Sequence, residues 1–83
     1  MKKEVMILTG AGQIGMAIAR RMGAGKKIIL GDKSRKNAED IARTMNNAGF
    51  DVLPMEMDLS SRSSILSLID EAQKHGEISM LVN

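Results

Sequence analysis

The sequence alternates without interruption between short apolar runs and longer segments with a helical pattern, and this alternation constrains the fold more than any other feature. We predict strands at about 4–9, 27–31, 51–57 and 78–82, with helices at 13–23, 34–48 and 61–75 between them. Successive strands joined by single helices form a parallel sheet through right-handed crossovers. The expected fold is therefore an α/β unit of the form βαβαβαβ.

The second and third predicted helices each carry an apolar stripe and have recognisable ends. Ser34 can cap the start of helix 34–48 and Gly49 can end it, whereas serines at 60 and 61 precede helix 61–75 and Gly76 follows it. The stripes consist of Ala38, Ile41, Ala42 and Met45 in one helix and of Ile65, Leu66, Ile69 and Ala72 in the other. Because such residues share one side of a helix, we expect both helices to pack on the sheet.

The first predicted strand runs directly into a glycine-rich turn with the spacing G-x-G-x-x-G, and a helix follows at once. Such a turn can bind a pyrophosphate: Gly10 permits the tight bend, Gly12 lets the main chain approach the phosphates, and Gly15 lets helix and strand pack closely. The unpaired N–H groups and partial positive charge of the helix start also favour an anion. An ordinary packing turn would have the same spacing, so this motif alone leaves both interpretations open.

Acidic residues end the second and third predicted strands. Asp32 lies about 20 residues beyond the glycine turn, the offset expected of an acid that binds an adenosine ribose. Asp58 could accept a hydrogen bond from the adenine amino group. Parallel strands end at one edge of a sheet, so both acids are expected in one crevice of a sheet with the order 3-2-1-4. A loop carboxylate is the alternative interpretation of Asp32, and a helix N-cap is the alternative for Asp58.

A small basic group, Lys33, Arg35 and Lys36, directly follows Asp32. These side chains could bind a ribose 2′-phosphate, or they could form the solvated start of a helix. Asp32 itself repels a phosphate, so the residues leave both interpretations open.

The composition narrows the possible function classes. A chain of 83 residues, 43% of them hydrophobic, forms one small domain at most. The net charge is only +2 and Phe50 is the one aromatic residue, which argues against nucleic-acid binding. Cysteine is absent and there is one histidine, so we expect no metal site. The N-terminal apolar run is too short for a signal peptide and no run approaches a membrane span, so we expect a cytoplasmic protein without a membrane partner.

Together these motifs resemble the short-chain dehydrogenase/reductase family over the whole chain. The turn at 9–15 looks like the glycine motif of that family, and Asp32 looks like its ribose-binding acid. Asp58 and Leu59 look like its adenine-binding pair, and residues 81–83 look like the opening of its Asn-Ala-Gly segment. One departure concerns the glycines, because the family pattern is T-G-x-x-x-G-x-G and this chain has T-G-x-G-x-x-G.

The resemblance implies a Rossmann-like, partial doubly wound fold that binds a nicotinamide dinucleotide. The candidate cofactor-binding residues, from the motifs and the resemblance together, are Gly10, Gly12, Gln13, Ile14, Gly15, Asp32, Lys33, Asp58, Leu59 and Asn83. Asp32 implies NAD rather than NADP, and Lys33 leaves NADP open.

The resemblance also implies chemistry that this chain does not carry. In the family a Tyr transfers a proton, a Lys lowers its pKa and a Ser holds the substrate oxygen, all on later elements, and this chain contains no tyrosine. Hydride transfer to a carbonyl needs a proton donor of matched pKa. We therefore expect residues 1–83 to be the dinucleotide-binding, N-terminal part of a longer oxidoreductase for alcohol or carbonyl substrates. This stretch is expected to be inactive by itself, to have no catalytic residue, and to belong to a homo-oligomer.

Two other functions remain open at this stage. One is a non-catalytic module that binds a nucleotide or assembles with itself through an exposed sheet. The other is a fragment of an S-adenosylmethionine-dependent methyltransferase, which the tight turn into a helix disfavours because it suits a pyrophosphate better than a sulfonium.

Overall fold

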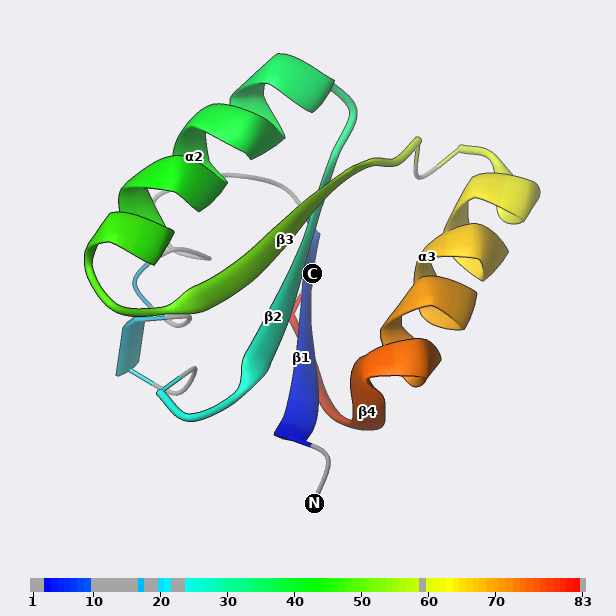
Figure 1. Cartoon of the computed structure of the whole chain (residues 1–83). Coiled ribbons are helices and arrows are strands. Elements are labelled where there is room, and N and C mark those ends of the chain that lie inside the picture. The colour runs from blue at the N-terminus through cyan, green and yellow to red at the C-terminus, as the bar shows by residue number, and fades with distance from the viewer. Residues whose placement is uncertain (1–2, 10–16, 18–19, 22–23, 59, 83) are drawn as a thin grey trace.

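The computed structural model describes residues 3–9, 17, 20–21, 24–58 and 60–82, and within these ranges it forms one parallel sheet flanked by helices. The strands are β1 (Lys3–Thr9), β2 (Lys27–Asp32), β3 (Asp51–Glu56) and β4 (Gly76–Val82), and the helices are α2 (Arg35–Asn47) and α3 (Arg62–His75). The strand order β3-β2-β1-β4 confirms the predicted order and the α/β Rossmann-like fold (Figure 1). Most of the helix predicted at 13–23 lies outside the described residues.

Helices α2 and α3 cover opposite faces of the sheet, as Figure 1 shows. Successive side chains of a strand point to opposite faces, so β1 and β2 contribute to two separate cores. The core under α2 contains Met6, Leu8, Ile28, Leu30, Ala38, Ala42, Met45 and Val52. The core under α3 contains Val5, Ile7, Ile29, Met57, Leu68 and Ala72. Because both faces are covered, the central strands carry unbroken apolar runs, Val5–Leu8 in β1 and Ile28–Leu30 in β2, instead of alternating.

The predicted ends of α2 and α3 are confirmed. The Ser34 hydroxyl accepts from the Asn37 N–H at 3.3 Å and caps α2, and Gly49 follows α2 with a φ of +100°. Glycine suits this left-handed conformation because it has no Cβ to clash with the following carbonyl. The Ser61 hydroxyl caps α3 in the same way, accepting from the Ser64 N–H at 3.3 Å.

The apolar stripe predicted for α3 is wrong at one position. Leu66 is 54% exposed, whereas Leu68 is buried against the sheet. Ile65, Leu68, Ile69 and Ala72 have the i, i+3, i+4, i+7 spacing and face the sheet together. Leu66 is only one position from Ile65, and one step along a helix turns it about 100° away from that face.

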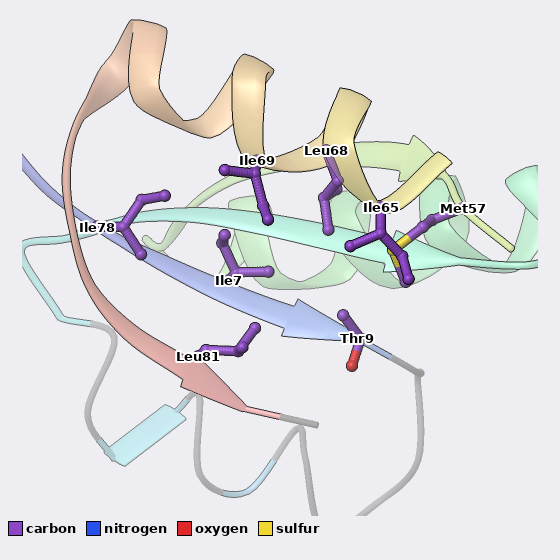
Figure 2. A pocket seen from close by; sticks show the side chains of 8 residues that line it. All are labelled: Ile7, Thr9, Met57, Ile65, Leu68, Ile69, Ile78 and Leu81. Carbon is purple, nitrogen blue, oxygen red and sulfur yellow. The ribbon is translucent and has the colours of Figure 1, made fainter. Parts of the chain in front are cut away.

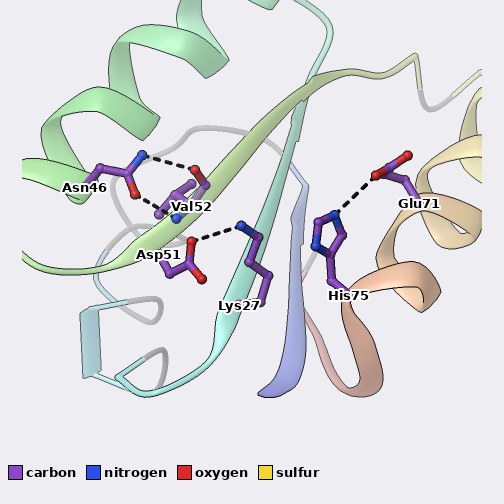
Figure 3. A network of polar contacts seen from close by, with 6 residues as sticks. All are labelled: Lys27, Asn46, Asp51, Val52, Glu71 and His75. Atoms are coloured by element: carbon purple, nitrogen blue, oxygen red, sulfur yellow. Dashed lines mark hydrogen bonds and ion pairs between the residues drawn. The ribbon is translucent and has the colours of Figure 1, made fainter. Parts of the chain in front are cut away.

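The outer edge of β3 is occupied by a side chain. The Asn46 amide donates to the Val52 carbonyl at 3.1 Å and accepts from the Val52 N–H at 2.8 Å (Figure 3). Pro54 further along this strand has no N–H to offer to a neighbour. An ion pair of 2.9 Å between Lys27 and Asp51 joins the starts of β2 and β3. The Asn46 amide and Pro54 protect β3 as an edge strand from pairing with another chain.

Candidate functional site

The carboxyl ends of the four strands lie at one edge of the sheet, where the acids predicted to bind a cofactor are found. Thr9 at the end of β1 is in register with Gly31, the residue before Asp32. Asp32 ends β2, and Asp58 lies two residues beyond the end of β3. Because β2 and β3 are neighbours in the sheet, the structure brings Asp32 and Asp58 to adjacent strand ends, as predicted.

Asp32 is half-buried and is held by two contacts. Its Oδ1 accepts from the Ser34 N–H at 2.9 Å, which orients the carboxylate above the start of α2. Its carbonyl accepts from the Met57 N–H at 2.8 Å. This second bond extends the link between the two chain segments beyond the end of β3. It therefore fixes the backbone that carries Asp58 relative to Asp32.

Asp58 is half-buried and receives two hydrogen bonds from one residue. Ser60 donates to Asp58 Oδ1 through its N–H at 2.9 Å and through its hydroxyl at 2.7 Å. The Asp58 N–H donates to the Ser64 hydroxyl at 3.0 Å, which ties this residue to the first turn of α3. The alternative interpretation of Asp58 as the helix cap is wrong, because Ser61 has that role.

The environment of Asp58 favours its ionised form. The Ser60 hydroxyl lowers the pKa of Asp58 most, the Ser60 N–H lowers it further, and the positive charge of Lys33 acts in the same direction. Partial desolvation opposes these effects without reversing them. Hydrogen bonds to a carboxylate stabilise the anion relative to the neutral acid. Asp58 is therefore an anionic acceptor at neutral pH, and Lys33 is close enough to act on it.

Gly31 lets α3 approach β2 beside this edge. A Cβ added at Gly31 would lie 3.3 Å from Met57 Cβ and 3.4 Å from Leu68 Cδ1, closer than side chains usually pack. The missing Cβ at Gly31 thus leaves room for the segment after β3, and with it Asp58, to lie close to the end of β2.

The other predicted cofactor-binding residues lie outside the described residues. They are Gly10, Gly12, Gln13, Ile14, Gly15, Leu59 and Asn83. Sequence reasoning named Ser60 only as a possible part of a helix start and did not assign a role to Ser64. The Asp-x-Ser spacing could have indicated the contact between Asp58 and Ser60, since aspartate side chains often accept from the backbone two residues on.

An apolar pocket of about 230 Å³ opens on the face of the sheet that α3 covers. Figure 2 shows Ile65, Leu68 and Ile69 projecting from α3 toward side chains of β1 and β4. Leu81 of β4 lines the pocket and is 65% exposed. Among the residues that the structure describes, no charged side chain lines this pocket, so this lining suits apolar groups and not phosphates.

Comparison with known proteins agrees with this geometry. The family model for short chain dehydrogenase matches residues 4–83, nearly the whole chain. The chain belongs to the short-chain dehydrogenase/reductase family. A short-chain dehydrogenase/reductase of Alternaria brassicicola is 35% identical over 82 residues, covering 99% of this chain and 30% of the relative. The 7alpha-hydroxysteroid dehydrogenase of Bacteroides fragilis is 35% identical over 85 residues, covering 99% of this chain and 33% of the relative.

Solved structures of short-chain dehydrogenases/reductases share the fold. A hydroxysteroid dehydrogenase from Escherichia coli superposes with a TM-score of 0.86 at 28% identity, over 96% of this chain and 34% of that one. A family member from Burkholderia phymatum in complex with NAD gives a TM-score of 0.84 at 26% identity, over 96% and 30% of the two chains. The chain therefore spans about a third of the length of the family members that it matches. Neither α2 nor α3, the helices whose full course is described, has the length and apolar character needed to cross a membrane.

Proposed function

We propose that this chain binds a nicotinamide adenine dinucleotide at the carboxyl edge of its sheet. The main support is the pair of half-buried carboxylates, Asp32 and Asp58, which lie at the ends of neighbouring strands. A 2.8 Å hydrogen bond from the Met57 N–H to the Asp32 carbonyl joins the backbones of these two strand ends. Family membership and the NAD complex of a structural neighbour support the same proposal.

The residues present fit such a cofactor. Asp32 accepts from the hydroxyls of the adenosine ribose, and Asp58 accepts from the adenine amino group. The remaining candidates, assigned from sequence, are Gly10, Gly12, Gln13, Ile14 and Gly15 at the pyrophosphate, Leu59 at the adenine, and Asn83 beyond the fourth strand. When bound, the cofactor supplies or accepts the hydride, and the protein supplies binding and orientation.

Within this proposal NAD is preferred to NADP. The carboxylate of Asp32 accepts from a free 2′-hydroxyl and repels a 2′-phosphate. Lys33 is exposed and directly follows Asp32, and its charge acts on Asp58, the residue proposed to bind the adenine. Lys33 thus reduces the discrimination against NADP without reversing it.

The test is the ratio of the affinities for NAD and NADP, measured by calorimetry on the natural full-length protein. Asp32→Ala removes an acceptor that is worth about 1.5 to 3 kcal/mol when charged. The preference for NAD is therefore expected to fall by about tenfold or more. Glu77→Ala is the matched control, because Glu77 is an exposed carboxylate near the start of β4, at the opposite edge of the sheet. An unchanged ratio in Asp32→Ala would exclude Asp32 from the ribose site.

We further propose that the complete protein is an oxidoreductase for alcohol or carbonyl substrates whose proton donor lies outside residues 1–83, since these include no tyrosine. Membership of the family disfavours both a methyltransferase fragment and a purely non-catalytic module. A cytoplasmic location and a homo-oligomeric state stay predictions.

A further inference from the structure

Ser60 donates both of its hydrogen bonds to the same oxygen of Asp58. Its N–H lies 2.9 Å and its hydroxyl 2.7 Å from Oδ1. Within the described ranges, no hydrogen-bond donor contacts Oδ2. The two oxygens of this carboxylate are therefore not equivalent, because one is fully engaged by the protein and the other keeps its acceptor capacity.

The backbone of Asp58 is held independently of its side chain. Its N–H donates to the Ser64 hydroxyl at 3.0 Å, and its carbonyl accepts from the Ser61 N–H at 3.0 Å. The rotation of an aspartate carboxylate about its last bond is soft and roughly two-fold. The hydroxyl of Ser60, together with its N–H, is what selects one orientation of that group.

We infer that Ser60 is a positioning residue of the cofactor site, whose hydroxyl holds Asp58 so that one carboxylate oxygen is presented to the adenine amino group. The preference for adenine over a base that lacks this amino group then depends on Ser60 although Ser60 does not touch the base. This inference rests on the proposed function, because it assumes that Asp58 faces the adenine of a bound dinucleotide.

The test compares NAD with nicotinamide hypoxanthine dinucleotide, in which a carbonyl oxygen replaces the adenine amino group. On the natural full-length protein we expect NAD to bind at least about tenfold more tightly than the hypoxanthine dinucleotide. This is the factor expected for one hydrogen bond to a charged acceptor. In Ser60→Ala this ratio is expected to fall by about threefold or more, because only the weaker backbone donor remains. Ser60→Thr keeps the hydroxyl and is expected to restore the ratio, and Ser60 is exposed, so the added methyl group has room.

Asp58→Asn gives a sharper result. The Ser60 donors hold the amide oxygen, so the amide nitrogen takes the place of Oδ2 and donates to the hypoxanthine carbonyl. The preference is then expected to reverse toward the hypoxanthine dinucleotide. Adding Ser60→Ala to this variant is expected to weaken the reversal.

The matched control is Ser63→Ala, because the Ser63 hydroxyl contacts that of Ser61 at 3.1 Å and does not touch Asp58. It should leave the ratio unchanged. Equal losses of affinity for both dinucleotides in Ser60→Ala would show a purely structural role and overturn the inference. The inference would also be overturned if Asp58→Asn changes the ratio of the two affinities and Ser60→Ala does not. The proposed function would then remain intact. If the unmodified protein binds neither dinucleotide, the proposed function fails and the inference fails with it.

Discussion

The side chain of Asp58 carries the clearest electrostatic signature among the described residues. Its pKa is lowered in the folded protein, first by the Ser60 hydroxyl and then by the Ser60 N–H. Because its pKa is lower in the folded than in the unfolded state, this carboxylate stabilises the fold at pH values above the unfolded pKa of aspartate, about 3.9. That contribution is lost as the pH falls through the lowered folded pKa.

Ser60→Ala is therefore expected to raise the pKa of Asp58 toward that of an ordinary aspartate. The stabilisation from this carboxylate would then be lost at a higher pH than in the unmodified protein. Carboxyl-carbon NMR titration of Asp58 measures the shift directly, with Ser63→Ala as the control. Equal midpoints in Ser60→Ala and in the unmodified protein would show that the hydroxyl does not stabilise the anion.

The two acids differ in how far their surroundings could be predicted from the sequence. The adjacency of Asp32 and Asp58 followed from parallel strands, because such strands end at one edge whatever the details of the loops. The hydrogen bonds that Asp58 makes with Ser60 and Ser64 depend on how the chain turns between β3 and α3. Several nearby serines could cap a helix there, and the local pattern does not distinguish them.

At the scale of elements, the ends of α2 and α3 could be predicted from the sequence. Which side of a helix faces the sheet was harder to predict. Ser34, Gly49 and Ser61 act through backbone contacts within their own segments, which is why short-range patterns identify them. The orientation of α3 depends on which leucine fits against β1 and β2. Leu66 and Leu68 are equally apolar, and only the packing under α3 decides that Leu68 is the buried one.

This difference predicts contrasting effects of two identical substitutions in one helix. Leu68→Ala removes a side chain that is 2% exposed and is expected to lower the free energy of unfolding by about 2 to 5 kcal/mol. Leu66→Ala alters a side chain that is 54% exposed and is expected to change it by no more than about 0.5 kcal/mol. Urea denaturation followed by circular dichroism measures both. Similar losses in the two variants would contradict an α3 that turns Leu68 toward the sheet and Leu66 away from it.

At the scale of the whole molecule, the strand order was predictable because alternation restricts the topology and the dinucleotide-binding pattern then selects one order. The same topology creates two cores on opposite faces of β1 and β2, so the sheet separates the packing of α2 from that of α3. Segments that lead to both faces meet at the carboxyl edge. Asp32 leads into α2 on one face, and Asp58 leads into α3 on the other.

A ligand bound at this edge would therefore stabilise the packing of α2 and that of α3 together. At a concentration of 100 times its Kd, a ligand specific for the folded state adds about 2.7 kcal/mol to the free energy of unfolding. We expect NAD to produce this stabilisation in denaturant titrations, and NADP at the same concentration to produce less. S-adenosylmethionine should have no effect, and Asp32→Ala should reduce the difference between NAD and NADP. Equal stabilisation by NAD and S-adenosylmethionine would contradict the proposed dinucleotide site, because S-adenosylmethionine has no pyrophosphate for the predicted glycine turn to bind.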